Sequence, residues 1–310
     1  MSEDMNPLLR RTGAQAKFGT VTIAGEDARR TPDVVAALRA RFASPSYKPP
    51  LLPAIAVEVN QLAQQSSVDM RKLVAVVEKD PLLAAGLIKL AQSAASAPAG
   101  GITSVQAAAV RVGLRNVADL AWEVALDTQV FRSPAYAGLM EVVRKHSIAC
   151  AHLARLVAGF TSIATDYAFL CGLLHDVGMA AALVVLGNET GAAPLTETDT
   201  GDVLAACHEE ASRIVAAMWK LPSDIQIVLG CHHRVIVDKL VHPLTAIVAI
   251  AEQLARHCEL GVLAAANNCD STDGSALAAA RTALRLDDAG MTALRAQAET
   301  LIATLRPSLG

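Results

Sequence analysis

The sequence predicts an all-α protein, and three observations support this fold class. Hydrophobic residues make up 53% of the 310 residues but aromatic residues only 3%, and this Ala-, Leu- and Val-rich composition favours closely packed helices. Apolar residues recur at helical spacing from Pro53 onwards. Residues that start and stop helices separate these periodic stretches. A chain of this length can form one large domain or two packed subdomains with a substantial core.

Residues 1–45 are expected to form a peripheral N-terminal arm that is partly flexible or used for docking. Residues 18–23 alternate like a β-strand, but a single strand cannot satisfy its own edges. The Pro-rich residues 47–53 are expected to lead into the helical part as a stiff, extended segment. Each Pro fixes its own φ and restricts the residue before it.

Residues 46–132 are expected to form an N-terminal helical subdomain of five helices. Asp80 followed by Pro81 is typical of an N-cap and a first helical position. Residues 103–106, Thr-Ser-Val-Gln, form a capping-box pattern that opens the fourth helix. The fifth helix is expected over about residues 115–131. The apolar positions that define the first three helices are Ile55, Val59 and Leu62, then Leu73, Val76 and Val77, and then Leu83, Leu87 and Leu90.

Residues 133–258 are expected to form a second helical subdomain, because Ser133-Pro134 marks a boundary. A loop rich in Gly, Thr and Pro occupies residues 187–201. Residues 259–310 are expected to form an Ala-rich C-terminal helical extension with a polar break at residues 267–274. In this subdomain one helix is expected to end near His175-Asp176. Other successive helices are expected to carry His146, His208, His232-His233 and Glu252.

The most informative motif is His175-Asp176, followed by Gly178, with further histidines on neighbouring helices. Neutral imidazoles and carboxylates that converge from several helices can hold one or two divalent ions. Adjacent residues on a helix point about 100° apart, so His175 and Asp176 can face different sides of a two-metal cluster. The pair His232-His233 has the same property. Each of these residues also has a structural interpretation, as a helix cap, a polar helix end or a solvated helix residue.

A series of motifs resembles the successive landmarks of the HDOD domain, a relative of the HD phosphohydrolases and of the HD-GYP proteins that hydrolyse cyclic dinucleotides. The resemblance covers roughly residues 45–255. It implies an all-helical, HD-like fold of two packed subdomains and a bacterial signalling or regulatory role, with no established catalytic activity. The motifs are LLPA at 51–54, VEKDPL at 77–82, IKLAQSA at 88–94, ITSV at 102–105, VGLR at 112–115, LLHDVG at 173–178 and WKLP at 219–222.

The resemblance to the HD-GYP pattern also implies a set of metal ligands. The catalytic relatives close this set with an Asp, where this chain has Glu252, which is one methylene longer. After the His-Asp-x-Gly turn they carry a Lys, where this chain has Met179, which cannot supply a charge to a phosphate. In an active centre, His175 and Asp176 would be the catalytic residues. The implied metal ligands are His146, His175, Asp176, His208, His232, His233 and Glu252, and the expected ions are one or two of Fe, Mn or Zn.

Charge and composition argue against several classes of partner. The formal net charge is −3, from 27 basic and 30 acidic side chains, which gives no electrostatic case for nucleic acid or an anionic membrane. No stretch reaches about 18 to 20 uninterrupted apolar residues. The N-terminus lacks the pattern of a signal peptide. We therefore expect a cytoplasmic protein that does not bind membranes and keeps its six cysteines reduced.

Two functions remain open at this point. The first is a regulatory protein that binds a protein partner in a signalling pathway, or a nucleotide, and whose HD-like centre binds metal without clear catalysis. The alternative is a metal-dependent phosphohydrolase or phosphodiesterase that acts on a nucleotide or cyclic dinucleotide. Met179 favours the first function, and the near-complete set of ligands favours the second.

Overall fold

The computed structural model describes residues 31–50, 54–63, 69–93, 102, 104–161, 168–188, 194–237, 239–262 and 274–309. Within these ranges the protein is built from helices, with one short β-hairpin, so the all-α prediction is confirmed. The elements before residue 133 are α1 (Thr31–Ala43), α2 (Ala54–Ala63), α3 (Met70–Val77), α4 (Pro81–Ser93), α5 (Val105–Val112) and α6 (Leu114–Gln129). The later elements are η1 (Pro134–Tyr136), α7 (Ala137–Gly159), α8 (Ala168–Leu174), α9 (Val177–Gly187), α10 (Glu197–Met218), α11 (Ser223–Cys231), β1 (Ile236–Val237), β2 (Leu240–Val241), α12 (Pro243–His257), α13 (Gly274–Ala283) and α14 (Asp288–Leu309).

Local sequence signals determine where several helices begin. The Asp80 carboxylate accepts a hydrogen bond from the backbone N–H of Leu82 at 2.9 Å and caps α4, as its sequence predicted. The Ser104 hydroxyl accepts the backbone N–H of Ala107 at 3.1 Å and caps α5. Thr103, the first residue of the expected capping box, lies outside the described residues.

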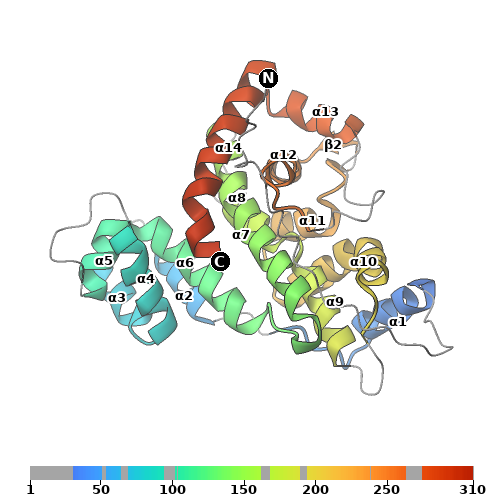
Figure 1. Ribbon diagram of the computed structural model, residues 1–310, viewed down its shortest axis with the longest axis horizontal. Helices are drawn as coiled ribbons and strands as arrows, with labels where there is room; N and C mark the ends of the chain where they lie inside the picture. The colour runs from blue at the N-terminus through green and yellow to red at the C-terminus, as the bar shows by residue number, and fades with distance from the viewer. Residues whose placement is uncertain are drawn as a thin grey trace, which may run out of the picture.

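The buried apolar side chains form two clusters. One lies among α2 to α6, and the other takes in α1 and the helices from α7 onwards. The helix α6 contributes to both, with Val117 in the first cluster and Leu126 in the second. Figure 1 shows α2 to α6 on the left of the molecule and the remaining helices to their right. The two clusters are consistent with two helical subdomains, and the boundary at residues 132 and 133 stays a prediction.

Residues 31–43, which the sequence analysis assigned to a peripheral arm, form the helix α1 and pack on α10. The Arg39 guanidinium also contacts α10, with Nε 3.0 Å from the Glu210 carboxylate and Nη2 donating to the Ala206 carbonyl at 3.0 Å. Residues 1–30, including the strand-like stretch 18–23, lie outside the described residues. The side chains that α1 buries are those of Val34, Val35, Leu38 and Phe42.

The most apolar part of the chain lies at the centre of the second cluster. The stretch Ala168–Gly187 is long and apolar enough to cross a membrane, with a mean hydropathy of 2.0, but 89% of an 18-residue window within it is buried inside the protein. His175 and Asp176 lie in the turn between α8 and α9, directly after the end of α8, so the helix expected to end near them does so. In this fold the stretch is a core element that packs against α7 and α10.

Two glycines allow this central stretch to approach its neighbours closely. A Cβ atom on Gly172 would lie 2.4 Å from the backbone oxygen of Cys150 on α7. A Cβ atom on Gly178 would lie 2.2 Å from the backbone oxygen of His208 and 2.5 Å from the backbone nitrogen of Ser212, both on α10. These distances are too short for any other residue. The absence of a side chain at each glycine therefore brings the turn that carries His175 and Asp176 against α7 and α10.

The C-terminal extension is helical, as expected. Its helix α13 packs on α12, and α14 packs on α7. The Arg144 guanidinium of α7 donates to the backbone carbonyl of Leu309 at 2.7 Å, close to the end of α14. Residues 267–273 of the expected polar break lie outside the described residues.

The substitution Gly178→Ala should destabilise the protein by about 3 kcal/mol, because the new methyl group would collide with the backbone of α10. Urea unfolding, followed by circular dichroism, measures this loss. Gly159→Ala is the matched control, because a Cβ atom there meets nothing within 4 Å, and it should leave stability unchanged or slightly higher. Equal stability of the two variants would contradict this account of the packing.

Candidate metal centre

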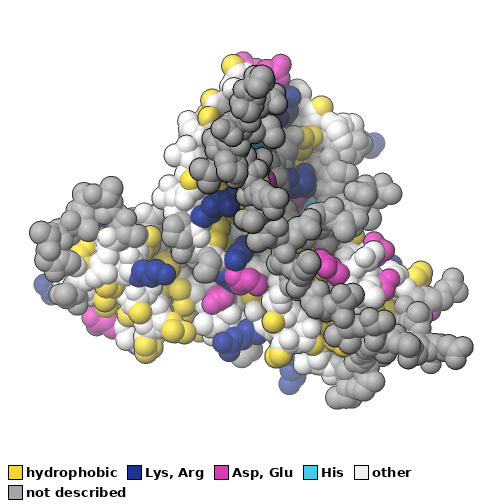
Figure 2. Space-filling view, viewed as in Figure 1, with side chains coloured by type: hydrophobic (Ala, Val, Ile, Leu, Met, Phe, Trp, Pro, Cys, Tyr) yellow, Lys and Arg dark blue, Asp and Glu magenta, His cyan; other side chains and the backbone are white. Residues whose placement is uncertain are grey.

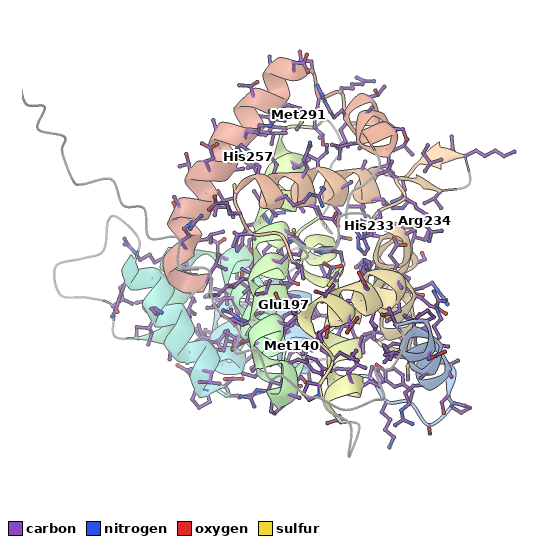
Figure 3. All side chains as sticks on the ribbon, turned by 45° about the vertical axis from the view of Figure 1, so that its right-hand side comes forward. Met140, Glu197, His233, Arg234, His257 and Met291 are labelled. Atoms are coloured by element: carbon purple, nitrogen blue, oxygen red, sulfur yellow. The ribbon has the colours of Figure 1, made fainter. Side chains whose placement is uncertain are left out.

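All seven residues that the resemblance implied as ligands come together where five segments of the chain meet. Six of them have exposed fractions of 5% or less, and His233, with a side chain that is 15% exposed, is the exception. Figure 3 labels His233 beside α10 and α12. The segments are α7 with His146, the turn after α8 with His175 and Asp176, α10 with His208, the turn after α11 with His232 and His233, and α12 with Glu252.

The pair His232-His233 lies just beyond a helix rather than within one, which corrects the sequence prediction. The helix α11 ends at Cys231, and His232 is its C-cap residue. The two rings are tilted by 51° to one another, with centroids 4.2 Å apart. Both imidazoles therefore reach the same side of the centre from consecutive positions.

The Asp176 carboxylate lies between two groups of histidines. Its Oδ2 atom is 3.2 Å from Nε2 of His175 and 3.6 Å from Nε2 of His146. Its Oδ1 atom is 3.3 Å from Nε2 of His232 and 3.8 Å from Nε2 of His208. One carboxylate thus faces two sets of nitrogen donors with its two oxygens, as a bridging ligand between two ions does.

Backbone carbonyls determine how three of the imidazoles face the centre. The Nδ1 atom of His146 is 2.7 Å from the Leu260 carbonyl, and Nδ1 of His175 is 2.8 Å from the Gly172 carbonyl. Nδ1 of His208 is 2.9 Å from the carbonyl oxygen of Leu204, four residues earlier on the same helix. A carbonyl oxygen only accepts, so each Nδ1 carries the hydrogen and each Nε2 directs its lone pair inwards when the ring is neutral. This is how proteins orient metal-ligating histidines.

Two of these inward nitrogens face each other closely. Nε2 of His146 and Nε2 of His175 are 3.2 Å apart, and two lone pairs at this distance repel each other. Either a proton or a cation must lie between or beside them. The contact therefore fits a site that exchanges a proton for a metal ion.

Glu252 reaches both groups of histidines despite its additional methylene. Its Oε1 atom is 3.5 Å from Nε2 of His175 and 3.8 Å from Nε2 of His232. Its Oε2 atom is 3.6 Å from Nδ1 of His233 and 3.8 Å from Nη1 of Arg256. A glutamate at this position can thus serve as a ligand where the catalytic relatives have an aspartate.

Several buried polar atoms of the centre make no hydrogen bond with the residues that the structure describes. They are Oδ1 of Asp176 and both ring nitrogens of His232. Buried polar groups are nearly always satisfied, so these atoms fit ligands that await a cation. Five imidazoles and two carboxylates form a set of donors that suits Zn, Fe or Mn.

Burial and mutual contact shift the pKa values of the centre in opposite directions. Burial opposes a charge on His175, but the Asp176 carboxylate outweighs it and raises the pKa of His175 to about 9. Burial by itself would raise the pKa of Asp176, but charged His175 beside it holds that pKa well below its ordinary value of 3.8. Burial, with the nearby His175, lowers the pKa of His146 to about 4. Burial also lowers the pKa of His232 and His233.

Residues that the sequence analysis did not select also shape the centre. The Ser212 hydroxyl accepts the backbone N–H of Gly178 at 2.8 Å and donates to the His175 carbonyl at 2.8 Å, so it fixes the turn to α10. Cys150 lies beside His146, with Sγ 3.5 Å from Nε2. Each of the two stands four residues after a predicted ligand, a spacing that places both on the ligand's face of a helix. This spacing was the available signal.

Other residues lie away from the donor set. Met179, which stands where the catalytic relatives carry Lys, is 1% exposed and belongs to the apolar core. His152 contacts Glu123 at 2.9 Å. His242 lies at the N-cap of α12, and His257 contacts the Glu299 carboxylate at 2.8 Å.

The metal-free protein should lose stability as the pH falls below 6.5. The pKa of folded His146 is about 4, below the ordinary 6.5, so its contribution is present above pH 6.5 and lost as the pH falls towards 4. His232 and His233 shift in the same direction. His175 shifts the other way, and its contribution is lost as the pH rises from 6.5 through about 9.

Urea unfolding of chelator-treated protein between pH 4 and 9 measures this profile. His146→Gln should reduce the loss of stability between pH 6.5 and 4, and His257→Gln, at an exposed position, should leave it unchanged. An identical acid slope in all three proteins would contradict the assignment to the buried histidines.

Known proteins of similar structure share this helical arrangement. An HDOD domain protein of unknown function from Geobacter sulfurreducens has a TM-score of 0.66 and 21% identity, over 90% of this chain and 98% of that one. A Shewanella amazonensis SB2B protein, provisionally described as a metal-dependent phosphohydrolase, has a TM-score of 0.59 and 17% identity, over 87% and 99% of the two chains. A Marinobacter aquaeolei VT8 protein, provisionally described as a signal transduction protein, has a TM-score of 0.60 and 21% identity, over 90% and 65%.

Sequence comparison gives the family. An uncharacterized protein of Treponema pallidum (strain Nichols) is 26% identical over an alignment of 221 residues that covers 67% of this chain. The match takes in only 42% of that protein, so the chain spans less than half the length of this curated relative. The HDOD domain matches residues 50–235 of this chain, which is more than half of it. The chain therefore belongs to the HDOD domain family.

Proposed function

We propose that this protein is a bacterial, cytoplasmic regulatory HDOD protein that binds one or two divalent ions at its HD-like centre and acts by binding a protein partner. The ions are Fe, Mn or Zn, the partner belongs to a signalling pathway, and a nucleotide is a further ligand to test. In this proposal the centre holds the fold in its binding-competent form and does not turn over a substrate.

The observation that carries the metal-binding part is the position of Asp176. Its two carboxylate oxygens face different groups of imidazoles, His146 and His175 on one side and His208 and His232 on the other. Bound ions would lie on either side of this carboxylate, and Glu252 would contribute to both. A divalent ion in such a site acts as a charge that holds several segments together.

Burial of the donors supports a structural or regulatory centre over a catalytic one. A catalytic metal site keeps a coordination position open to water or substrate. Here six of the seven donor residues have exposed fractions of 5% or less, and only His233 has appreciable exposure. Met179 supports the same conclusion, because a buried thioether cannot neutralise a phosphate.

Exposed apolar side chains on the N-terminal helices support a protein partner. Leu82 on α4 is 61% exposed and Val110 on α5 is 64% exposed. Figure 2 shows hydrophobic side chains gathered on this part of the molecule, over the helices that Figure 1 places on the left. Grouped apolar surface of this kind is typical of a site where another protein binds.

The alternative function is a metal-dependent phosphohydrolase acting on a nucleotide or cyclic dinucleotide. The specific observation in its favour is that all seven ligand positions remain filled by residues able to bind metal and lie together. In that case the ions held by these residues would supply activated water for hydrolysis, and His175 and Asp176 would be essential.

Purification without chelator or nickel resin should yield protein with about one or two equivalents of Fe, Mn or Zn, measured by mass spectrometry. Asp176→Ala should lose this metal, because the substitution removes the ligand that faces both groups of histidines. Asp202→Ala, at an exposed position on α10, is the matched control and should retain it. The metal-loaded protein should release no product from nucleotides or cyclic dinucleotides, as analysed by liquid chromatography.

Two outcomes would overturn parts of the proposal. If the Asp202→Ala protein hydrolyses any nucleotide and the Asp176→Ala protein does not, the protein is a phosphohydrolase instead. A folded, metal-free protein that takes up no Fe, Mn or Zn would remove the metal centre from the account.

A further inference from the structure

A cysteine lies within reach of the proposed ion on the α7 side of the centre. Cys150 follows His146 by four residues, so both side chains lie on one face of α7. Its sulfur is 3.5 Å from Nε2 of His146. Donor atoms of His146, Cys150 and His175 all lie within 4.8 Å of one another, and Cys150 is fully buried.

The distances among these atoms match those around a tetrahedral ion. With bonds of about 2.3 Å to sulfur and about 2.05 Å to nitrogen, a sulfur and a nitrogen ligand lie about 3.6 Å apart, and two nitrogens about 3.3 Å apart. The observed separations are 3.5 Å between the Cys150 sulfur and Nε2 of His146, and 3.2 Å between Nε2 of His146 and Nε2 of His175.

Asp176 lies beside both histidines of this group, although its carboxylate is not among the donors that lie within 4.8 Å of Cys150. Its Oδ2 atom is 3.2 Å from Nε2 of His175 and 3.6 Å from Nε2 of His146, close to the edges that a tetrahedral zinc site requires. A second observation is independent of the cysteine. The inward nitrogens of His146 and His175 face each other with their Nδ1 hydrogens already donated to carbonyls, which calls for a proton or a cation between or beside them.

We propose that Cys150 is a thiolate ligand of the ion held by His146, His175 and Asp176, and that this position therefore takes Zn²⁺ rather than Mn²⁺ or Mg²⁺. The inference rests on the proposed metal centre and adds a sulfur donor to it. Thiolate ligands favour Zn²⁺, whereas carboxylate and water ligands favour Mg²⁺ and Mn²⁺. The thiol proton leaves to solvent when the metal–sulfur bond forms.

In the metal-free protein the same geometry allows a thiol hydrogen bond. The S–H group of Cys150 can donate to the lone pair on Nε2 of His146 over the observed 3.5 Å. This contact would place the sulfur beside the site without making it a ligand. The two cases differ in whether the sulfur binds the metal once an ion is present.

Titration of the chelator-treated protein with Co²⁺ separates these cases, because cobalt replaces zinc and gives a near-ultraviolet charge-transfer band only when sulfur is bound. The native protein should show the band, and Cys150→Ala should lose it. Cys171→Ala is the matched control, since Cys171 is equally buried and lies outside the groups of donors, and it should keep the band. Zinc affinity relative to manganese should fall in Cys150→Ala and not in the control.

X-ray absorption of the zinc-loaded native protein tests the same bond without a variant, and therefore stands even where Cys150→Ala does not fold. One sulfur at about 2.3 Å from zinc is expected. Cobalt that binds with no charge-transfer band, or zinc surrounded only by nitrogen and oxygen, would overturn the role of Cys150 and leave the metal centre intact. Failure to bind either metal would instead overturn the proposed function, and this inference with it.

Discussion

The structure depends on one buried constraint, the Asp176 carboxylate enclosed among imidazoles within an apolar core. A carboxylate in such surroundings is costly unless positive charge faces it. In the metal-free protein the charged His175 provides that charge, since its pKa is raised to about 9. Divalent ions would provide more, on both sides of the carboxylate. Because the ligands come from five segments of the chain, whatever neutralises Asp176 also ties those segments together.

The close packing of helices around the centre brings its polar groups together. The turn that carries His175 and Asp176 reaches α7 and α10 only because Gly172 and Gly178 present no side chain to the facing backbones. The Ser212 hydroxyl then bridges the turn to α10, and carbonyls at the backs of the histidines direct the Nε2 atoms inwards. The apolar stretch Ala168–Gly187 supplies the dry surroundings that make each of these polar contacts strong.

Local signals in the sequence predicted much of the fold, and non-local packing accounts for the rest. The N-cap at Asp80 and the helical spacing of apolar residues after Pro53 involve only neighbouring residues, so the sequence alone predicts these helices. The resemblance selected the ligands, but no local signal placed His232 beyond the end of α11. The sequence did not predict the helix α1, because its apolar face is buried only by packing on α10, which is far along the chain. The proximity of Cys150 to His175 likewise depends on how α7 and α8 pack against each other.

The most direct test of the central claim is the anomalous scattering of crystals grown or soaked with Mn²⁺ or Zn²⁺, collected at the metal edge. The account predicts anomalous peaks beside the Asp176 carboxylate, with one on each side when two ions bind, about 3.5–4 Å apart as in other two-metal sites. Folded protein in crystals at saturating metal, with no peak within bonding distance of Asp176, would contradict it.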